Sequence, residues 1–333
     1  CPNFLFDVAT ITQTGGIERL VERIGADRMF VASNMPMAYE HCGYFLLQAA
    51  ALSTEDQRLI GGGNLARLFG IPEPAAAPKP ISWAKFRDWP KTDTHWHTSG
   101  WNIVEPRTAI EALQEEFTTF SYQRVISNSI RALSDDLEAG NAETRDFMDR
   151  DPRVRGLIVI NPLEPKNSIA QIEKWRTDPR FVGVKTIQDF YGLDLDAPGY
   201  FQIFDHVARL DRYPVMAHLP GMRRAAERYP TLNFIAAHST WRHHELVDMP
   251  NAWFDIATST SLRAESDIGD LIAAVGADRV LYSSDGQLMN PAWTLGKLAG
   301  LDLGDDALDA IFRRTALRAF PRLADDATEV TSV

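Results

Sequence analysis

The sequence predicts an α/β fold, a (β/α)8 TIM barrel, between residues 83 and 322. Three observations lead to this prediction: eight short apolar runs follow one another, helical patterns separate most of them, and four of the runs end in a histidine or an aspartate. Strand ends converge in very few architectures, and in this barrel the chemistry lies at the C-terminal rim of the strands. The 240 residues of the region are close to the ~250 that are typical of the fold.

The expected strands are continuous apolar runs rather than alternating ones, which is typical of a parallel sheet buried on both faces. They are expected at 91–97, 122–129, 154–161, 181–187, 214–219, 232–238, 253–257 and 280–284.

Helical patterns fall between most of these runs. The first, at 108–117, opens with a capping-box pattern, Thr108-x-x-Glu111. The others are expected at 142–149, 169–176, 199–210, 222–229 and 268–275.

The strongest candidate site begins at the end of the first strand, in Thr94-His95-Trp96-His97-Thr98. Side chains two residues apart share one face of a strand, so His95 and His97 can direct two imidazoles at one cation, whereas Trp96 is expected to pack in the barrel. The alternative is that both histidines are buried, hydrogen-bonded and chemically idle. What favours the metal hypothesis is that later runs also end in such residues, namely His218, His238 and Asp285.

Composition excludes several classes of protein. A net charge of −11 argues against nucleic acid or an anionic membrane as the main partner, because both attract basic surfaces. No apolar run approaches the ~20 residues of a membrane-spanning helix. The two cysteines, Cys1 and Cys42, are too few for a disulfide framework, so the cytoplasm is the expected compartment.

The first 70 residues repeat the last 75. The segment from Pro2 to Thr10 matches the segment from Pro250 to Thr258, 248 positions later, and Gly25-Ala26-Asp27-Arg28 matches Gly276-Ala277-Asp278-Arg279 at 251 positions. We therefore expect 1–70 to be the C-terminal remnant of a degenerate preceding barrel, 71–82 a Pro/Ala-rich linker, 83–322 the complete barrel and 323–333 a flexible acidic tail. The alternative is that 1–70 forms an extra layer on the barrel. Asn34 stands where the second copy has Asp285, so the first copy is expected to be inactive.

The order and spacing of these motifs resemble the amidohydrolase superfamily, in its amidohydrolase-related branch of decarboxylases and dicarboxylate lactonases. The resemblance is carried by Asp93 to His97, Gly183-Val184-Lys185, Pro214 to His218, Tyr229 to His238, and Gly276 to Asp285.

The resemblance implies metal ligands at His95, His97, His218 and Asp285, with His238 and Asp285 as catalytic residues. The implied cofactor is one divalent ion, Zn²⁺ first, with Mn²⁺ or Fe²⁺ as alternatives. Three imidazoles and a carboxylate leave a coordination position for water, whose pKa a divalent ion lowers from 15.7 to ~7. His238 would orient or deprotonate that water, or protonate a leaving group or a substrate carbon, because imidazole titrates in the useful range.

The expected function is metal-dependent hydrolysis of a small organic acid, ester, lactone or amide. Non-oxidative decarboxylation of an aromatic or unsaturated acid is one alternative, and a non-catalytic barrel serving as a partner or scaffold is another. The expected partner is a carboxylated small molecule, and the sequence leaves open whether the protein forms a homodimer.

Lys185 is interpreted as an ordinary rim charge, with a second, lysine-bridged metal as the less favoured option. Three arginines are candidate carboxylate clamps or solvated arginines, namely Arg223, Arg224 and Arg242.

Overall fold

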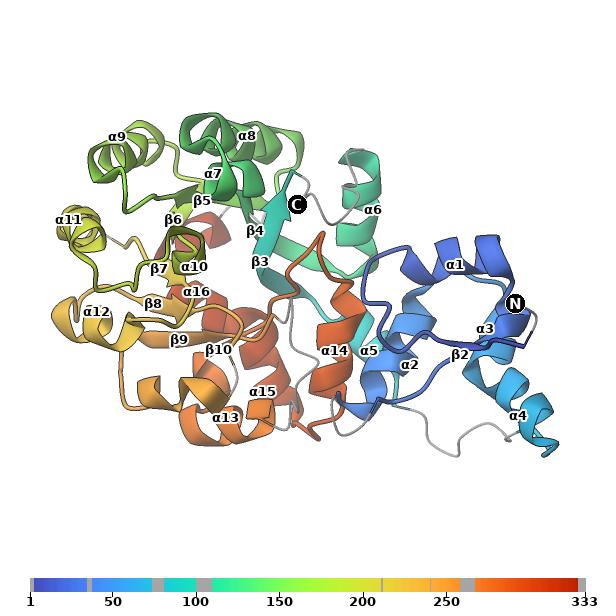
Figure 1. The fold of residues 1–333 in the computed structure, drawn as a ribbon. Coiled ribbons are helices and arrows are strands. Elements are labelled where there is room, and N and C mark those ends of the chain that lie inside the picture. Colours follow the sequence, from blue (N-terminus) through green and yellow to red (C-terminus); the bar gives the residue numbers. More distant parts are fainter. Residues whose placement is uncertain are drawn as a thin grey trace.

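The chain folds around an eight-stranded parallel sheet that curls into a nearly closed barrel (Figure 1). The computed structural model describes residues 3–34, 38–73, 81–99, 110–210, 212–239, 241–257 and 267–328. Thr108, most of the expected linker and residues 329–333 lie outside these ranges.

All eight predicted strands are confirmed, and they neighbour one another in chain order. They are β3 (Lys91–Thr98), β4 (Tyr122–Ser129), β5 (Val154–Val159), β6 (Phe181–Lys185), β7 (Val215–Ala217), β8 (Phe234–Ala236), β9 (Ala252–Asp255) and β10 (Val280–Leu281).

The barrel closes between its first strand, β3, and the segment that follows its last strand, β10. The amide of Thr94 donates to the carbonyl of Tyr282 at 3.1 Å, and the amide of His97 donates to the carbonyl of Gly286 at 3.0 Å. Next to these two hydrogen bonds, the carboxylate of Asp93 accepts from the hydroxyl of Ser284 at 2.5 Å. This seam places the residues after β10 directly against β3.

Trp96 explains why a glycine follows Asp285 at the seam. Its ring is fully buried and packs on Phe117 with ring centroids 5.0 Å apart, as the sequence predicts for a packing residue. A Cβ at Gly286 would lie 1.9 Å from that ring. Because Trp96 takes this side of β3, its neighbours His95 and His97 face the other side.

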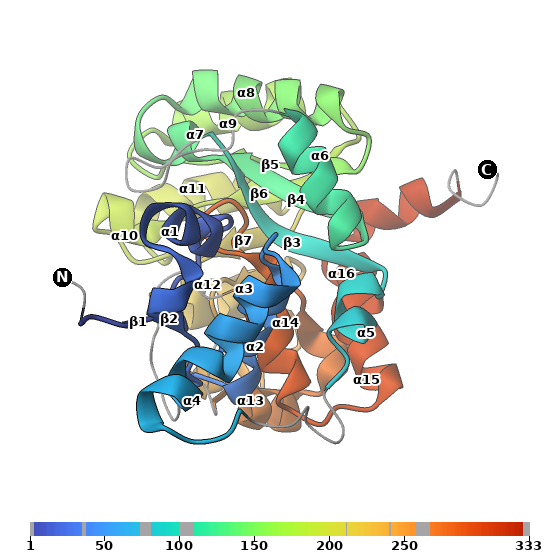
Figure 2. The ribbon, with the colours of Figure 1, turned by 90° about the vertical axis from the view of Figure 1, so that its right-hand side faces the viewer.

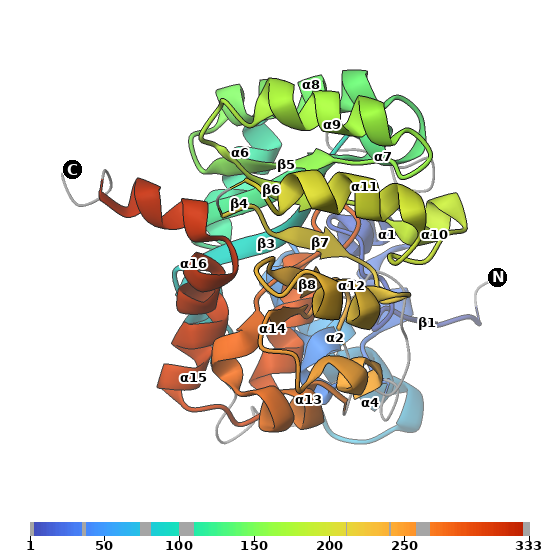
Figure 3. The ribbon, with the colours of Figure 1, turned by 90° about the vertical axis from the view of Figure 1, so that its left-hand side faces the viewer.

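Helices surround the barrel (Figures 1 and 3). The predicted helices are confirmed apart from their end residues and the part of the first that lies outside the described ranges. The barrel helices are α5 (Trp83–Asp88), α6 (Ile110–Thr119), α7 (Ile130–Ser134), α8 (Leu137–Arg150), α9 (Pro165–Trp175), α10 (Gln188–Tyr191), α11 (Pro198–Val207), α12 (Met222–Arg228), α13 (Asp267–Val275), α14 (Pro291–Ala299), α15 (Asp305–Asp309) and α16 (Thr315–Ala319), with short segments η3 (Trp241–Leu246), η4 (Ala277–Arg279), η5 (Ala310–Arg314) and η6 (Pro321–Thr328). No helix among the described residues is long and apolar enough to span a membrane.

Residues 3–73 form a smaller unit beside the barrel, with a two-stranded parallel sheet, β1 (Phe6–Asp7) and β2 (Met29–Phe30). Its helical segments are α1 (Gly16–Ile24), η1 (Ala26–Arg28), α2 (Glu40–Ala49), α3 (Thr54–Arg58), η2 (Leu59–Gly63) and α4 (Asn64–Phe69). Phe6 pairs with Met29 in this sheet, and Phe254 pairs with Val280 in the barrel. In the internal sequence repeat, Phe6 corresponds to Phe254 and Met29 corresponds to Val280, so the two pairs occupy equivalent positions. That the unit is the remnant of a second barrel stays a prediction.

The unit is attached to the barrel through α2, which lies against α14 (Figures 1 and 2). All nine residues of α14 are buried, so this outer helix has no solvated face. A Cβ at Gly296 would lie only 2.6 Å from the Cα of Cys42. The two helices therefore approach so closely that only glycine fits at this position.

We expect Gly296→Ala to destabilise the protein by about 1–3 kcal/mol, because the added methyl group would push α2 away from α14. Urea unfolding measures this free energy. The matched control is Gly61→Ala, where the new Cβ would make an ordinary 3.6 Å contact with Leu47. Equal effects of the two substitutions would contradict the close approach.

Candidate metal centre

The candidate centre lies at the C-terminal ends of the barrel strands. His95 and His97 come from β3, and their side chains are 1% and 2% exposed. Their rings lie 5.1 Å apart, centroid to centroid. The His-x-His pair therefore projects two imidazoles into one buried site, as its spacing predicts.

His95 is held from both sides. Its Nδ1 lies 2.6 Å from Oδ2 of Asp255, at the end of β9, and its Nε2 lies 3.1 Å from Nζ of Lys185, at the end of β6. Asp255 also accepts from the amide of Ala257 and the hydroxyl of Ser283. Because Asp255 is a carboxylate, Nδ1 donates to it and Nε2 carries the lone pair.

Asp285 stands at the middle of the group. Its Oδ1 lies 3.2 Å from Nε2 of His97 and 3.8 Å from Nε2 of His95. Neither carboxylate oxygen has a hydrogen bond of good geometry among the described residues, although both are buried. The backbone of Asp285 is left-handed, with φ 62°, and its amide donates to the carbonyl of His95. This strained turn directs the carboxylate at the histidines.

His238 follows β8 and also has a left-handed backbone, with φ 57°. Its Nδ1 lies 2.9 Å from the carbonyl oxygen of Ala257, so Nδ1 is the donor and Nε2 is unprotonated in the neutral ring. Ligand-type atoms of His95, His238 and Asp285 all lie within 4.8 Å of one another. These three residues are the group among the described residues that could hold a metal ion.

His218, after β7, lies at the more exposed edge of the site. Its ring centroid is 5.1 Å from that of His238, and its Nδ1 is 2.7 Å from Asp189. Its Nε2 is buried and has no hydrogen-bond partner among the described residues. The structure thus brings all five predicted site residues into one continuous cluster, with His97 joined through Asp285 and His218 through His238. The assignment of ligand and catalytic roles among them stays a prediction.

Burial decides the charge of the centre. It lowers the pKa of His95 to about 3, and it also lowers the pKa values of His97 and His238, so the three imidazoles are neutral at pH 7. Burial opposes ionisation of Asp285, but its contact with His97 and the nearby His95 and His238 hold the pKa of that carboxyl below the ordinary range.

The structure shows that the interpretation of Lys185 as an ordinary rim charge is wrong. It is fully buried, and burial lowers its pKa to about 8, against the attraction of Asp255 and Asp285. Among its buried groups the centre therefore holds two carboxylates, those of Asp255 and Asp285, and one ammonium group, which leaves a net negative charge. Sequence patterns offered Lys185 at the centre only as the less favoured, metal-bridging option, and they did not reveal Asp255, although the two residues lie near the ends of the predicted strands 181–187 and 253–257.

These residues fit a divalent cation. The two oxygens of Asp285 and the Nε2 of His218 are buried acceptors without hydrogen-bond partners among the described residues. An unpaired buried carboxylate is costly unless a cation lies beside it. Neutral imidazole and carboxylate together suit zinc, manganese and iron.

The structure does not support Arg223 and Arg224 as carboxylate clamps, the option that the sequence left open beside solvated arginines. Arg223 pairs with Asp248 at 2.8 Å, and Arg224 pairs with Asp196 at 2.5 Å. Both guanidinium groups are therefore already engaged by acidic neighbours. The side chain of Arg242 lies outside the described residues.

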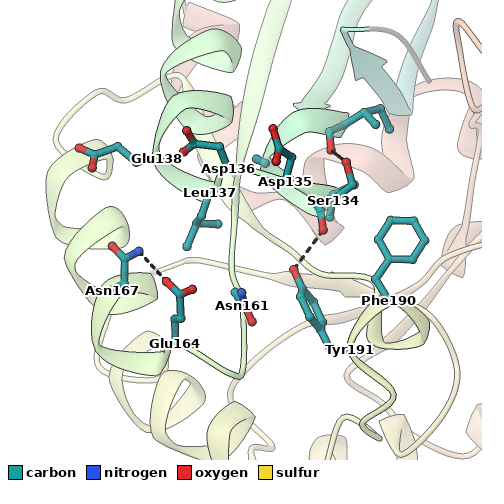
Figure 4. A pocket seen from close by; sticks show the side chains of 13 residues that line it. Ser134, Asp135, Asp136, Leu137, Glu138, Asn161, Glu164, Asn167, Phe190 and Tyr191 are labelled. Atoms are coloured by element: carbon teal, nitrogen blue, oxygen red, sulfur yellow. Dashed lines mark hydrogen bonds between the residues drawn. The ribbon is translucent and has the colours of Figure 1, made fainter. Parts of the chain in front are cut away.

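A separate surface pocket of about 820 Å³ lies beside α7 and α10 (Figure 4). Tyr191 crosses its floor and donates to the carbonyl of Leu133 at 3.4 Å. The pocket is lined by four carboxylates and no basic side chain: Asp135, Asp136, Glu138 and Glu164. The histidine cluster, where three ligand-type side chains converge, is the better candidate site.

The structure is similar to three solved enzymes at low sequence identity. 2,6-Dihydroxybenzoate decarboxylase from Rhizobium matches with TM-score 0.53 and 16% identity over 70% of this chain and 98% of its own. 5-Carboxyvanillate decarboxylase from Novosphingobium aromaticivorans, in complex with manganese and 4-hydroxy-3-methoxy-5-nitrobenzoic acid, matches with TM-score 0.55 and 14% identity over 71% and 97%. A probable 2-pyrone-4,6-dicarboxylic acid hydrolase from Acinetobacter baumannii, with citric acid bound, matches with TM-score 0.51 and 14% identity over 69% and 99%. At these identities the similarity establishes the fold.

No curated protein sequence matches the chain. The family model described as Amidohydrolase matches residues 123–322, which cover β4 to the end of the barrel. The chain therefore belongs to the amidohydrolase family.

Proposed function

We propose that this protein is a metal-dependent hydrolase of a small carboxylated ester, lactone or amide. The observation that carries the proposal is the buried carboxylate of Asp285, which lies among neutral imidazoles, 3.2 Å from Nε2 of His97, and makes no hydrogen bond of good geometry among the described residues. Such a carboxylate is stable when a cation lies beside it.

The proposed ligands are His95, His97, His218 and Asp285. His95 and Asp285 belong to the compact group of three described above, and His97 and His218 adjoin that group through Asp285 and His238. When bound, a divalent ion polarises a substrate oxygen and lowers the pKa of a coordinated water. Asp255 fixes the ring of His95 by accepting from Nδ1, so Nε2, which faces the ammonium group of Lys185 at 3.1 Å, carries the lone pair that a metal would take. Lys185 offsets part of the negative charge of the two carboxylates.

His238 is the proposed general base. Its Nδ1–H donates to a backbone carbonyl, so the nitrogen left to act on a proton is the unprotonated Nε2. Burial lowers its pKa, so the ring is in its proton-accepting form at pH 7. Hydrolysis needs such a base to take a proton from water, which is why we place hydrolysis first.

Decarboxylation is the second candidate, and the similarity to two aromatic-acid decarboxylases supports it. The third similar structure is a probable hydrolase of a dicarboxylic acid. In a decarboxylation, His238 would have to deliver a proton to carbon. Burial lowers the pKa of His238, which favours its proton-accepting form.

The first prediction separates the two reactions. Protein loaded with Zn²⁺ or Mn²⁺ should bind close to one equivalent and release acid, without CO₂, from lactones or esters that carry a carboxylate. His95→Ala should lose both metal and activity, whereas His206→Ala, on α11 and paired with Glu173, should lose neither. CO₂ release from aromatic acids would favour decarboxylation instead. Failure to bind any divalent ion would contradict both, and a loaded protein inactive on the whole panel would favour the non-catalytic barrel.

The second prediction concerns Asp255. Asp255→Asn should weaken the affinity for the metal about 10- to 100-fold, because His95 loses the carboxylate that fixes its tautomer. Competition with a chelator measures this affinity. The matched control, Asp270→Asn on the exposed face of α13, should leave it unchanged. An unchanged affinity in Asp255→Asn would show that His95 is not a ligand oriented by this contact.

The third prediction concerns pH. Because the pKa of His238 is lowered from 6.5, the base stays unprotonated below that pH, and kcat/KM should fall only as the pH drops further, through the lowered value. His238→Gln should keep the metal but lose about 10²- to 10⁴-fold in kcat. An acid midpoint above pH 6.5 would contradict this assignment, and loss of metal in His238→Gln would make His238 a ligand.

A further inference from the structure

His218 lies one residue beyond the end of β7, and a side chain on α10 holds its backbone. The last residue of β7, Ala217, pairs with Ala236, and His218 follows it. Gln188, on α10, is 1% exposed. Its Nε2 donates to the carbonyl of His218 at 2.6 Å, and its Oε1 accepts from the amide of His218 at 2.9 Å. A carboxamide can donate and accept at once, so Gln188 fixes this residue as a neighbouring strand would.

The loop after His218 fits closely against the segment after α10. Gln188 also donates to the carbonyl of Pro220 at 3.2 Å, and the amide of Leu195 donates to the same carbonyl at 2.9 Å. Gly221 has a left-handed backbone, with φ 78°, and a Cβ there would lie only 2.6 Å from the amide nitrogen of Leu195. The position of His218 is therefore set by α10 and the residues that follow it.

Asp189, the next residue on α10, holds the ring of His218. Its Oδ2 lies 2.7 Å from Nδ1 of the ring. Because an ionised carboxylate only accepts, Nδ1 is the donor, and the lone pair is on Nε2, which is buried and has no hydrogen-bond partner among the described residues. Asp255 and His95 form the same kind of pair at 2.6 Å. The two pairs differ in that Asp255 is fully buried, whereas the side chain of Asp189 is 58% exposed.

We propose that α10 is the positioning element of the metal centre: Gln188 holds the backbone of His218, and Asp189 holds its ring in the tautomer whose lone pair is on Nε2. His218 stands outside the compact group of three residues whose ligand atoms lie within 4.8 Å of one another. Its contribution as a ligand therefore depends on contacts that keep one nitrogen unprotonated and the backbone in place. Gln188 and Asp189 are positioning residues, since they act through His218. The inference rests on the proposed function in one respect, the role of His218 as a ligand.

The tautomer of His218 can be measured in the metal-free protein. Long-range ¹H–¹⁵N NMR spectra of the labelled chain at about pH 8, where an ordinary histidine is neutral, should show His218 with its proton on Nδ1. Asp189→Asn should lose this preference, because an amide can donate to Nδ1 as well as accept from it. The matched control is Asp194→Asn, whose carboxylate is also 58% exposed and lies 3.6 Å from Arg224; it should leave the tautomer unchanged. A proton on Nε2 of His218 in the unmodified protein would overturn the proposal.

Metal affinity tests whether Asp189 acts through His218. In the unmodified protein, Asp189→Asn should weaken the affinity for Zn²⁺ about 10- to 100-fold, measured by competition with a chelator. In a His218→Ala protein, which keeps the other three proposed ligands, the same substitution should have no further effect, since residues that act through one another are not additive. Asp194→Asn should change the affinity in neither protein. Equal losses in the two backgrounds would overturn the proposal, and so would an unchanged affinity in the first.

Gln188→Glu tests the hold on the backbone. The substitution keeps the size of the side chain but places an oxygen where Nε2 now donates to the carbonyl of His218. The affinity for Zn²⁺ should fall by at least about tenfold, and the His218→Ala protein should not show this loss. An unchanged affinity would contradict the role of Gln188. If this buried substitution prevents folding, the exposed Asp189 decides the proposal.

The inference and the proposed function can fail separately. A protein that binds Zn²⁺ with the expected dependence on Asp189 but hydrolyses no substrate would contradict only the proposed function, since neither the tautomer nor the affinity requires turnover. A working hydrolase in which both measurements are independent of Asp189 would overturn only the inference. A chain that binds no divalent ion would overturn both.

Discussion

The proposed chemistry depends on one electrostatic constraint, the ionised carboxylate of Asp285 at a buried position. Three buried imidazoles surround it, and burial keeps them neutral, so they contribute dipoles and lone pairs rather than positive charge. Lys185 supplies one positive charge, but Asp255 shares it. One negative charge is left over, and a divalent ion is the natural group to neutralise it.

The fold satisfies this constraint at the seam where the barrel closes. Asp93 accepts from Ser284, and Trp96 packs over Gly286, so β3 and the segment after β10 are fixed to each other on both sides of the site. Asp285 lies between these two contacts. Residues from opposite ends of the barrel sequence therefore meet because the sheet closes, and the same contacts that close the barrel form the candidate metal centre.

Sequence patterns predicted the parts of this structure that depend on local periodicity. The strand at 122–129 and the pair His95 and His97 are examples, since burial on both faces and a spacing of two are visible in the sequence. Lys185 was misjudged because a lysine at a strand end is usually solvated, and only the three-dimensional neighbours Asp255 and Asp285 explain its burial. The contact between Asp255 and His95 joins strands 160 residues apart, which no short motif records.

The most direct test of the account is a crystal structure of the protein grown with Mn²⁺, with anomalous scattering measured to locate the ion. The account predicts one strong anomalous peak within about 2.0–2.3 Å of an Asp285 oxygen and of imidazole nitrogens from β3. The contradicting result is a map with no peak at this position, in which Asp285 is neutralised by the ammonium group of Lys185 alone.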